Sequence, residues 1–126
     1  MSQDVVADAL NMMRNAKKAR KETVKIERVS KVLTEILKIM REKGAVQKFK
    51  IDSKGRYIEV TLGDFFTCKA IKPRFTVKKG DIEKYRRRYL PARNLGTVIV
   101  STNKGLMSHE EAQEKSQGGS LIAYFY

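Results

Sequence analysis

The pattern that most constrains the fold is an amphipathic helix followed at once by a β-hairpin. Apolar residues recur at three- and four-residue spacing from Val32 to Met40, with charged residues at the other positions, which predicts a helix with one buried face. Ser30 suits the N-cap of this helix, and Gly44 suits its C-terminal end. Two alternating runs, 47–52 and 56–62, follow with a Ser-Lys-Gly turn between them, which indicates a hairpin.

The residues before this pattern complete one lobe. Apolar residues at helical spacing predict a helix from residue 4 to about residue 15, which Asp4 can cap. Between the two helices, the strand-like piece is Thr23 to Ile26. The order helix, strand, helix, strand, strand predicts a compact α+β lobe over residues 1–63.

The second half of the chain has a different order and predicts a mostly β lobe with short helices over residues 64–126. Its expected strands are 68–71, 74–78, 97–100 and 121–125, and its expected helices are a short one between Asp81 and Pro91 and another from residue 108 to about residue 115. Asp81 and Ser108 are the expected N-caps, and Pro91 ends the first of these helices. The fold class expected for the whole chain is α+β with two small lobes.

The chain carries a large positive charge. Its 126 residues include 27 Lys and Arg against 14 Asp and Glu, a formal net charge of +13. Self-repulsion of this size calls for a polyanionic partner: nucleic acid, an anionic membrane or an acidic protein. Seven basic residues fall between Arg14 and Arg28, and ten fall between Lys69 and Arg93 beside only two acidic residues. As a set, these clusters favour RNA or DNA.

The sequence argues against a membrane and against an oxidising compartment. Asp4 and Asp8 stand where a signal peptide is basic and then apolar, and no run approaches the roughly 18 apolar residues of a spanning helix. A single cysteine, Cys68, cannot form an internal disulfide. We therefore expect a cytoplasmic protein.

The chain offers little catalytic chemistry. It has one His, one Cys, no phosphate-binding P-loop and no dinucleotide-binding glycine pattern. His109 follows Ser108, but neighbours at a helix start do not point at each other as a catalytic triad requires, so we expect a structural histidine. Cys68 has no partner ligands nearby in sequence and is expected to be a buried thiol. We expect no enzymatic activity, no cofactor, no metal and no small-molecule substrate.

The aromatic residues do not indicate a single-strand binder. Such proteins stack bases on exposed rings, whereas Phe65, Phe66, Phe75, Tyr85 and Tyr89 mostly fall at positions expected to face inward. Structured RNA is therefore favoured as the ligand.

Residues 101–105, Ser-Thr-Asn-Lys-Gly, are expected to form a loop after a buried strand. Their two hydroxyls, amide and ammonium are groups that reach base edges and ribose hydroxyls in the shallow minor groove of RNA. The same residue types also suit a plain polar turn. Residue chemistry alone leaves both interpretations open.

The segment from Ser101 to Ala112, STNKGLMSHEEA, is followed by the pair Gly118-Gly119. These motifs are similar to the C-terminal signature of the ribosomal protein S8 family, of the archaeal and eukaryotic type. Residues 14–16 (Arg-Asn-Ala), 72–75 (Lys-Pro-Arg-Phe) and 89–93 (Tyr-Leu-Pro-Ala-Arg) also match its pattern. The resemblance covers essentially the whole chain.

The resemblance implies a structural protein of the small ribosomal subunit that binds directly to the central domain of the small-subunit rRNA, at an irregular helix, and organises the platform during assembly. The implied partners are this RNA and neighbouring small-subunit ribosomal proteins. The implied RNA-binding residues are Ser101, Thr102, Asn103, Gly105, Gly118, Gly119, Arg14, Asn15 and Lys31. Basic residues near these motifs are added to the expected interface: Lys104, Lys72, Arg74, Arg87, Arg88 and Arg93.

Three positions depart from the family pattern. Val5 stands where Pro is expected, Gln113 where Arg is usual, and Ser120 where a charged residue is usual. The last two departures remove charged contacts near the signature, so we expect the arginine-rich helix before Pro91 to carry more of the affinity.

Two other classes of function stay open at this point. A basic adaptor would dock on acidic proteins, or on DNA without a preference for RNA, and would lose binding only with its charge clusters. An enzyme would have to work without His109 and Cys68, through scattered carboxylates.

Overall fold

The computed structural model describes residues 5–71, 76–92 and 95–126. The chain divides into two compact units, Met1–Lys69 and Ala70–Tyr126. Each unit combines helices with antiparallel strands, so the expected α+β class with two lobes is confirmed.

The first unit extends beyond Gly63, where the sequence placed the end of the lobe. Residues 64–69 belong to this unit because two of their side chains contact α1 (Val5–Lys18). The Lys17 ammonium lies 5.5 Å from the centroid of the Phe65 ring, and the Cys68 thiol donates a hydrogen bond to the Leu10 carbonyl at 3.3 Å.

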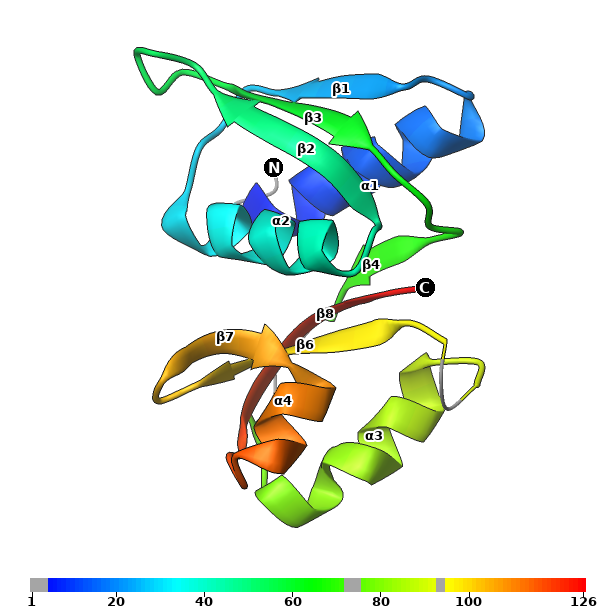
Figure 1. Cartoon of the computed structure of the whole chain (residues 1–126), viewed down its shortest axis with the longest axis vertical. Coiled ribbons are helices and arrows are strands. Elements are labelled where there is room, and N and C mark those ends of the chain that lie inside the picture. The colour runs from blue at the N-terminus through cyan, green and yellow to red at the C-terminus, as the bar shows by residue number, and fades with distance from the viewer. Residues whose placement is uncertain (1–4, 72–75, 93–94) are drawn as a thin grey trace. The chain divides into compact units, whose positions relative to one another are not determined.

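The elements of the first unit follow the predicted order. They are α1, β1 (Thr23–Ile26), α2 (Lys31–Glu42), β2 (Val46–Ile51) and β3 (Ile58–Leu62). Among the described residues the strands form an antiparallel sheet in the order β1-β3-β2, and Figure 1 shows α1 and α2 on one face of it. Alternation along β3 places Ile58, Val60 and Leu62 in the core and leaves Glu59 on the solvent side.

Both predicted boundaries of α2 are confirmed. The Ser30 hydroxyl accepts a hydrogen bond from the Leu33 amide at 3.0 Å, as an N-cap does. Gly44 follows the helix with a φ of +84°, a conformation that glycine adopts without steric cost. By contrast, α1 continues past the expected end at residue 15, because Ala16 is buried and extends the apolar face by one turn. Asp4 lies outside the described residues.

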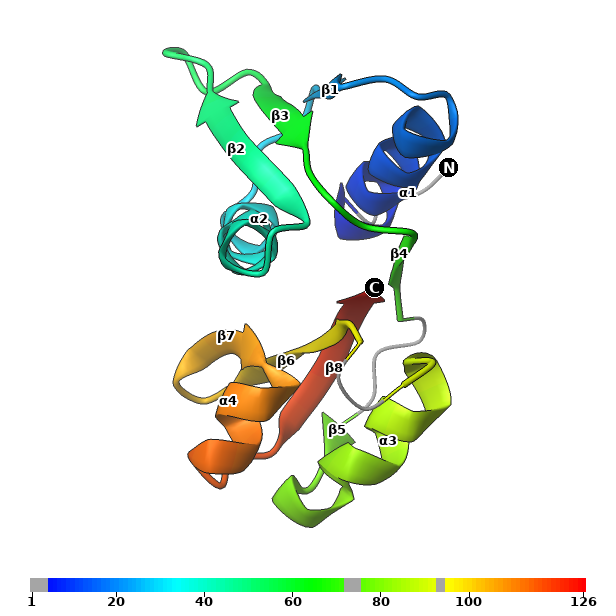
Figure 2. The same cartoon turned by 45° about the vertical axis from the view of Figure 1, so that its right-hand side comes forward.

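The second unit contains one sheet covered on one face by two helices, as Figure 2 shows. Its elements are β4 (Cys68–Ala70), which crosses the boundary, β5 (Thr76–Val77), a 3₁₀ turn (Lys79–Asp81), α3 (Ile82–Tyr89), β6 (Thr97–Thr102), β7 (Gly105–Ser108), α4 (His109–Glu114) and β8 (Gly119–Phe125). Among the described residues the strand order is β4-β8-β6-β7, and β5 also pairs with β8.

The core of the second unit lies between this sheet and the two helices. The sheet contributes buried Val98, Val100 and Leu121, while α3 contributes Ile82 and α4 contributes Ala112. The rings of Tyr85 and Tyr89 pack against this cluster, as the expected inner face of α3 requires. The core of the second unit therefore lies on the helix-covered face of the sheet.

The second unit corrects three expectations. The expected loop 101–105 is a tight β-hairpin, because β6 continues to Thr102 and β7 begins at Gly105. β8 begins at Gly119, two residues before its expected start. Asp81 precedes α3, but its side chain makes no capping hydrogen bond, since a 3₁₀ turn leads into the helix there.

The expectation that the aromatic rings face inward is only partly right. Phe65 is 5% exposed, but the next residue, Phe66, is 80% exposed. Phe65 packs within the first unit beside the Lys17 ammonium, whereas Phe66 falls at a bend between β3 and β4 and its ring faces solvent. Phe75 lies outside the described residues.

Candidate nucleic-acid interface

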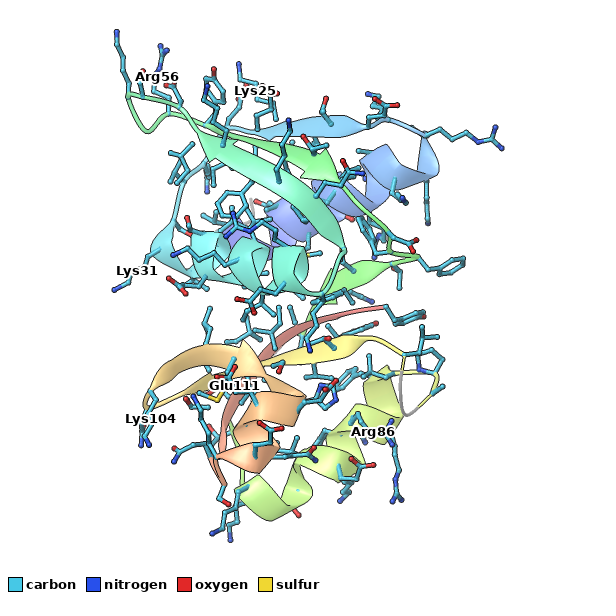
Figure 3. All side chains as sticks on the ribbon, viewed as in Figure 1. Lys25, Lys31, Arg56, Arg86, Lys104 and Glu111 are labelled. Atoms are coloured by element: carbon cyan, nitrogen blue, oxygen red, sulfur yellow. The ribbon has the colours of Figure 1, made fainter. Side chains whose placement is uncertain are left out.

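The signature at residues 101–105 forms the tip of the β6–β7 hairpin. Thr102 pairs with Gly105, which leaves Asn103 and Lys104 as the two turn residues. The Thr102 hydroxyl donates to the Gly105 carbonyl at 2.9 Å and accepts from the Lys104 amide at 3.1 Å. This hydroxyl therefore holds the turn, while Asn103 and Lys104 are exposed at its tip. In Figure 3 the Lys104 side chain extends away from the sheet.

The glycine pair lies against the neighbouring strands. An added Cβ at Gly119 would lie 2.8 Å from the carbonyl carbon of Ser101 and closer still to its oxygen. An added Cβ at Gly118 would lie 2.6 Å from the Val77 carbonyl oxygen. Backbone packing alone therefore requires both glycines. The structure brings Gly118 and Gly119 together with Ser101, as the expected interface requires.

A row of hydroxyl groups next to this place was not predicted from the sequence. Ser120 of β8 pairs with Ser101 of β6 on one side and with Thr76 of β5 on the other. The hydroxyl oxygens of Thr76 and Ser120 are 3.5 Å apart. Directly opposed residues in antiparallel strands carry their side chains on the same face, so the three hydroxyls form one row. In the sequence, this pairing is indicated by the polar–apolar alternation of Thr76 and Val77, which is too short to predict how β5 aligns with β8.

The arginines of α3 differ in their surroundings. Arg86 is 7% exposed and donates two hydrogen bonds to the Glu83 carboxylate, at 3.0 and 2.7 Å. The carboxylate raises the pKa of the Arg86 guanidinium, so this charge is held within the unit. Arg87 and Arg88 are exposed, and the Arg88 guanidinium lies 5.7 Å from the centroid of the Tyr85 ring. Of the three, Arg87 and Arg88 face solvent.

Gln113, one of the departures from the family pattern, contacts the same carboxylate. Its side-chain amide donates to Glu83 at 3.4 Å and so links α4 to α3. An arginine at position 113 would compete with Arg86 for the Glu83 carboxylate.

The expected residues of the first unit have unequal exposure. Arg14 is half-buried, and its guanidinium donates to the Asn11 side chain. Asn15 and Lys31 are exposed, and Figure 3 shows Lys31 extending outward at the start of α2. Lys17 of the same basic cluster instead donates to the Gly63 carbonyl at 2.6 Å. Three further expected residues, Lys72, Arg74 and Arg93, lie outside the described residues.

His109 and Cys68 both have structural surroundings. His109 is 2% exposed, and its Nδ1 accepts a hydrogen bond from the Val98 amide at 3.1 Å. The Ser108 hydroxyl caps α4 by accepting from the Glu111 amide at 3.2 Å, which confirms the expected capping spacing. Cys68 is fully buried, and its burial raises the pKa of the thiol to about 12.

Two kinds of feature are absent from the described residues. No helix among them is both long enough and apolar enough to span a bilayer. No group of three or more His, Cys, Asp or Glu side chains in that part of the chain is arranged to hold a metal ion.

The fold and surface define a small, strongly basic α+β protein whose second unit presents a polar hairpin beside a glycine pair. The sequence matches the family described as Ribosomal protein S8 over residues 4–126. It is 40% identical over 129 residues to the small ribosomal subunit protein uS8 of Nanoarchaeum equitans (strain Kin4-M), with 100% of both chains covered. The chain belongs to the ribosomal protein S8 family.

Proposed function

We propose that the protein is a structural constituent of the small ribosomal subunit that binds directly to the central domain of the small-subunit rRNA. It recognises an irregular helix there and organises the platform during assembly, next to other small-subunit ribosomal proteins. It works on the ribosome in the cytoplasm and performs no catalysis. Family membership and the net charge of +13 support this assignment.

The observation that carries the proposal is the convergence of the two signature segments. Residues 101–105 and Gly118-Gly119 are separated in sequence, yet β6 and β8 place them side by side. The hairpin tip presents the Asn103 amide and the Lys104 ammonium, while the glycines let β8 lie close against the backbone of β5 and β6. A polar hairpin tip of this kind suits the wide and shallow minor groove of RNA.

The residues of the proposed interface have two different roles, recognition of RNA shape and contact with phosphates. Ser101, Thr102, Asn103, Gly105, Gly118 and Gly119 form the part that distinguishes one RNA shape from another, with Thr102 acting through the turn it holds. The basic residues contact phosphates and position the RNA: Lys104, Arg87, Arg88, Lys72, Arg74 and Arg93, with Arg14, Asn15 and Lys31 from the first unit.

The test measures the affinity of the purified protein for a central-domain rRNA helix with an irregular internal loop and for a regular duplex of equal length, at moderate salt. The wild-type chain should prefer the irregular helix. Replacing both Ser101 and Asn103 with Ala should reduce this preference, because these side chains do not hold the turn as Thr102 does. Ser53→Ala, in the exposed turn between β2 and β3, is the matched control and should change nothing.

Salt dependence separates the phosphate contacts from the contacts that recognise shape. Replacing Arg87 and Arg88 with Gln should weaken binding to both RNAs alike and flatten the log–log salt slope by about 2. Equal affinity of the wild-type chain for both RNAs would instead leave a basic adaptor as the better description.

A further inference from the structure

We propose that the hydroxyl row of Thr76, Ser120 and Ser101 binds ribose 2′-hydroxyl groups of the RNA strand that the β6–β7 hairpin contacts. The inference rests on the proposed function, because it requires an RNA at this sheet face. It adds Thr76 and Ser120 to the binding residues and assigns the sugar, rather than a base, as the group that they recognise.

The row lies on the sheet face opposite the core of the second unit. Each of its members stands next to a residue of the buried cluster, and side chains alternate between the two faces of a strand. The pairs are Thr76 with Val77, Ser101 with Val100, and Ser120 with Leu121. Since the buried partners point toward α3 and α4, the three hydroxyls point the other way. Thr76 is exposed, and the other two are half-buried.

The hydrogen-bonding capacity of the row suits another hydroxyl. Thr76 and Ser120, 3.5 Å apart, share one proton in the bond between them, so the second proton and the remaining lone pairs are available to a ligand. A ribose 2′-hydroxyl is likewise both donor and acceptor. A phosphate oxygen only accepts, so a phosphate would use less of this capacity.

Positive charges lie along one side of the row, the side on which Gly118 and Gly119 precede Ser120. Lys104 lies in the turn beyond β6, and the exposed Lys78 and Lys79 directly follow β5. The backbone of these two lysines lies close to Gly118, since an added Cβ there would be 3.0 Å from the Lys79 nitrogen. Ammonium groups beside the row are placed for phosphates, and the hydroxyls of the row are placed for the sugars that the phosphates connect.

The experiment compares two versions of the irregular rRNA helix, one with ordinary ribose and one with 2′-fluoro sugars through the internal loop. The 2′-fluoro sugar keeps the RNA-like pucker but removes the hydroxyl. Thr76→Val and Ser120→Ala should each weaken binding to the ribose probe about two- to tenfold, the range expected for one hydrogen bond. Neither change should weaken binding to the 2′-fluoro probe, for which wild-type affinity is already reduced.

Two control variants keep the interpretation clear. Ser120→Thr retains a hydroxyl and should bind like the wild-type chain, whereas Thr23→Val removes an exposed hydroxyl from β1 of the first unit and should have no effect. Far-UV circular dichroism checks that each variant is folded.

The proposal is overturned if the variants bind the ribose probe as tightly as the wild-type chain does, or if they lose equal affinity for both probes. It is also overturned if Ser120→Thr weakens binding as much as Ser120→Ala. A wild-type chain that prefers the irregular helix while the row variants remain neutral would remove this inference alone. A wild-type chain without that preference would remove the proposed function as well.

Discussion

Replacing Gly119 with Ala should strongly destabilise the second unit. The added methyl group would lie 2.8 Å from the Ser101 carbonyl carbon and 3.1 Å from the Thr102 Cα, both backbone atoms that cannot rotate away. Nonpolar carbon atoms pack at about 3.5 Å or more, so β6 and β8 must separate locally by at least ~0.7 Å, and by more to clear the Ser101 carbonyl oxygen, which is the nearest atom. Overpacking of this kind costs about 1–3 kcal/mol, and a weakened hydrogen bond between the strands adds about 1 kcal/mol.

The entropic gain from replacing glycine works in the opposite direction but is smaller, about 0.4–1 kcal/mol. We therefore expect the free energy of unfolding to fall by about 2–3 kcal/mol, a large fraction of the total stability of a small domain. Urea unfolding followed by circular dichroism measures this difference. Gly80→Ala is the matched control, because nothing lies within 4 Å of its added Cβ. If Gly119→Ala is as stable as Gly80→Ala, the close approach of β8 to β6 is wrong.

Three further predictions concern single side chains. Ser30→Ala should lower the free energy of unfolding by about 1 kcal/mol in urea titrations, because it removes the N-cap of α2, and a change below about 0.3 kcal/mol would contradict that role. Thr102→Val should speed hydrogen exchange at the Lys104 amide, measured by NMR, because the amide loses its acceptor; unchanged exchange would mean that the hydroxyl does not hold the turn. Burial raises the pKa of the Cys68 thiol from 9.0 to about 12, so the stability linked to it is full below pH 9 and is lost as the pH rises from 9 to 12. Between pH 8 and pH 10, the free energy of unfolding of the wild-type chain, measured by urea titration, should therefore fall by about 1.4 kcal/mol more than that of Cys68→Ala. An equal fall in both proteins would show that the thiol is not buried in the folded state.

The elements that were predicted correctly are those specified by nearby residues. The caps at Ser30 and Ser108 and the turn glycine at Gly44 act within a few residues of the helix they bound, so sequence spacing identifies them. β7 was missed because Leu106 and Met107 become a strand only by pairing with β6, which is a contact between segments.

The same distinction applies to the candidate site. The signature residues were identified by resemblance, but the place of Thr76 depends on the register of a two-residue strand against β8, which no local pattern encodes. The basic clusters were identified by counting, yet counting does not show where a charge points. Lys17 and Arg86 use their cationic groups for hydrogen bonds within their own units. The number of cationic groups that can contact a polyanion is therefore smaller than the 27 Lys and Arg residues of the sequence.

The hydrogen bond that His109 accepts from the Val98 amide fixes the tautomer of the only histidine in the chain. A ring nitrogen that accepts a hydrogen bond cannot carry a proton, so the neutral imidazole must hold its proton on Nε2. The imidazole nitrogens should therefore give the ¹⁵N chemical-shift pattern of a single Nε2–H tautomer. That pattern makes His109 a spectroscopic reporter of whether α4 remains docked on the strand that leads to the hairpin.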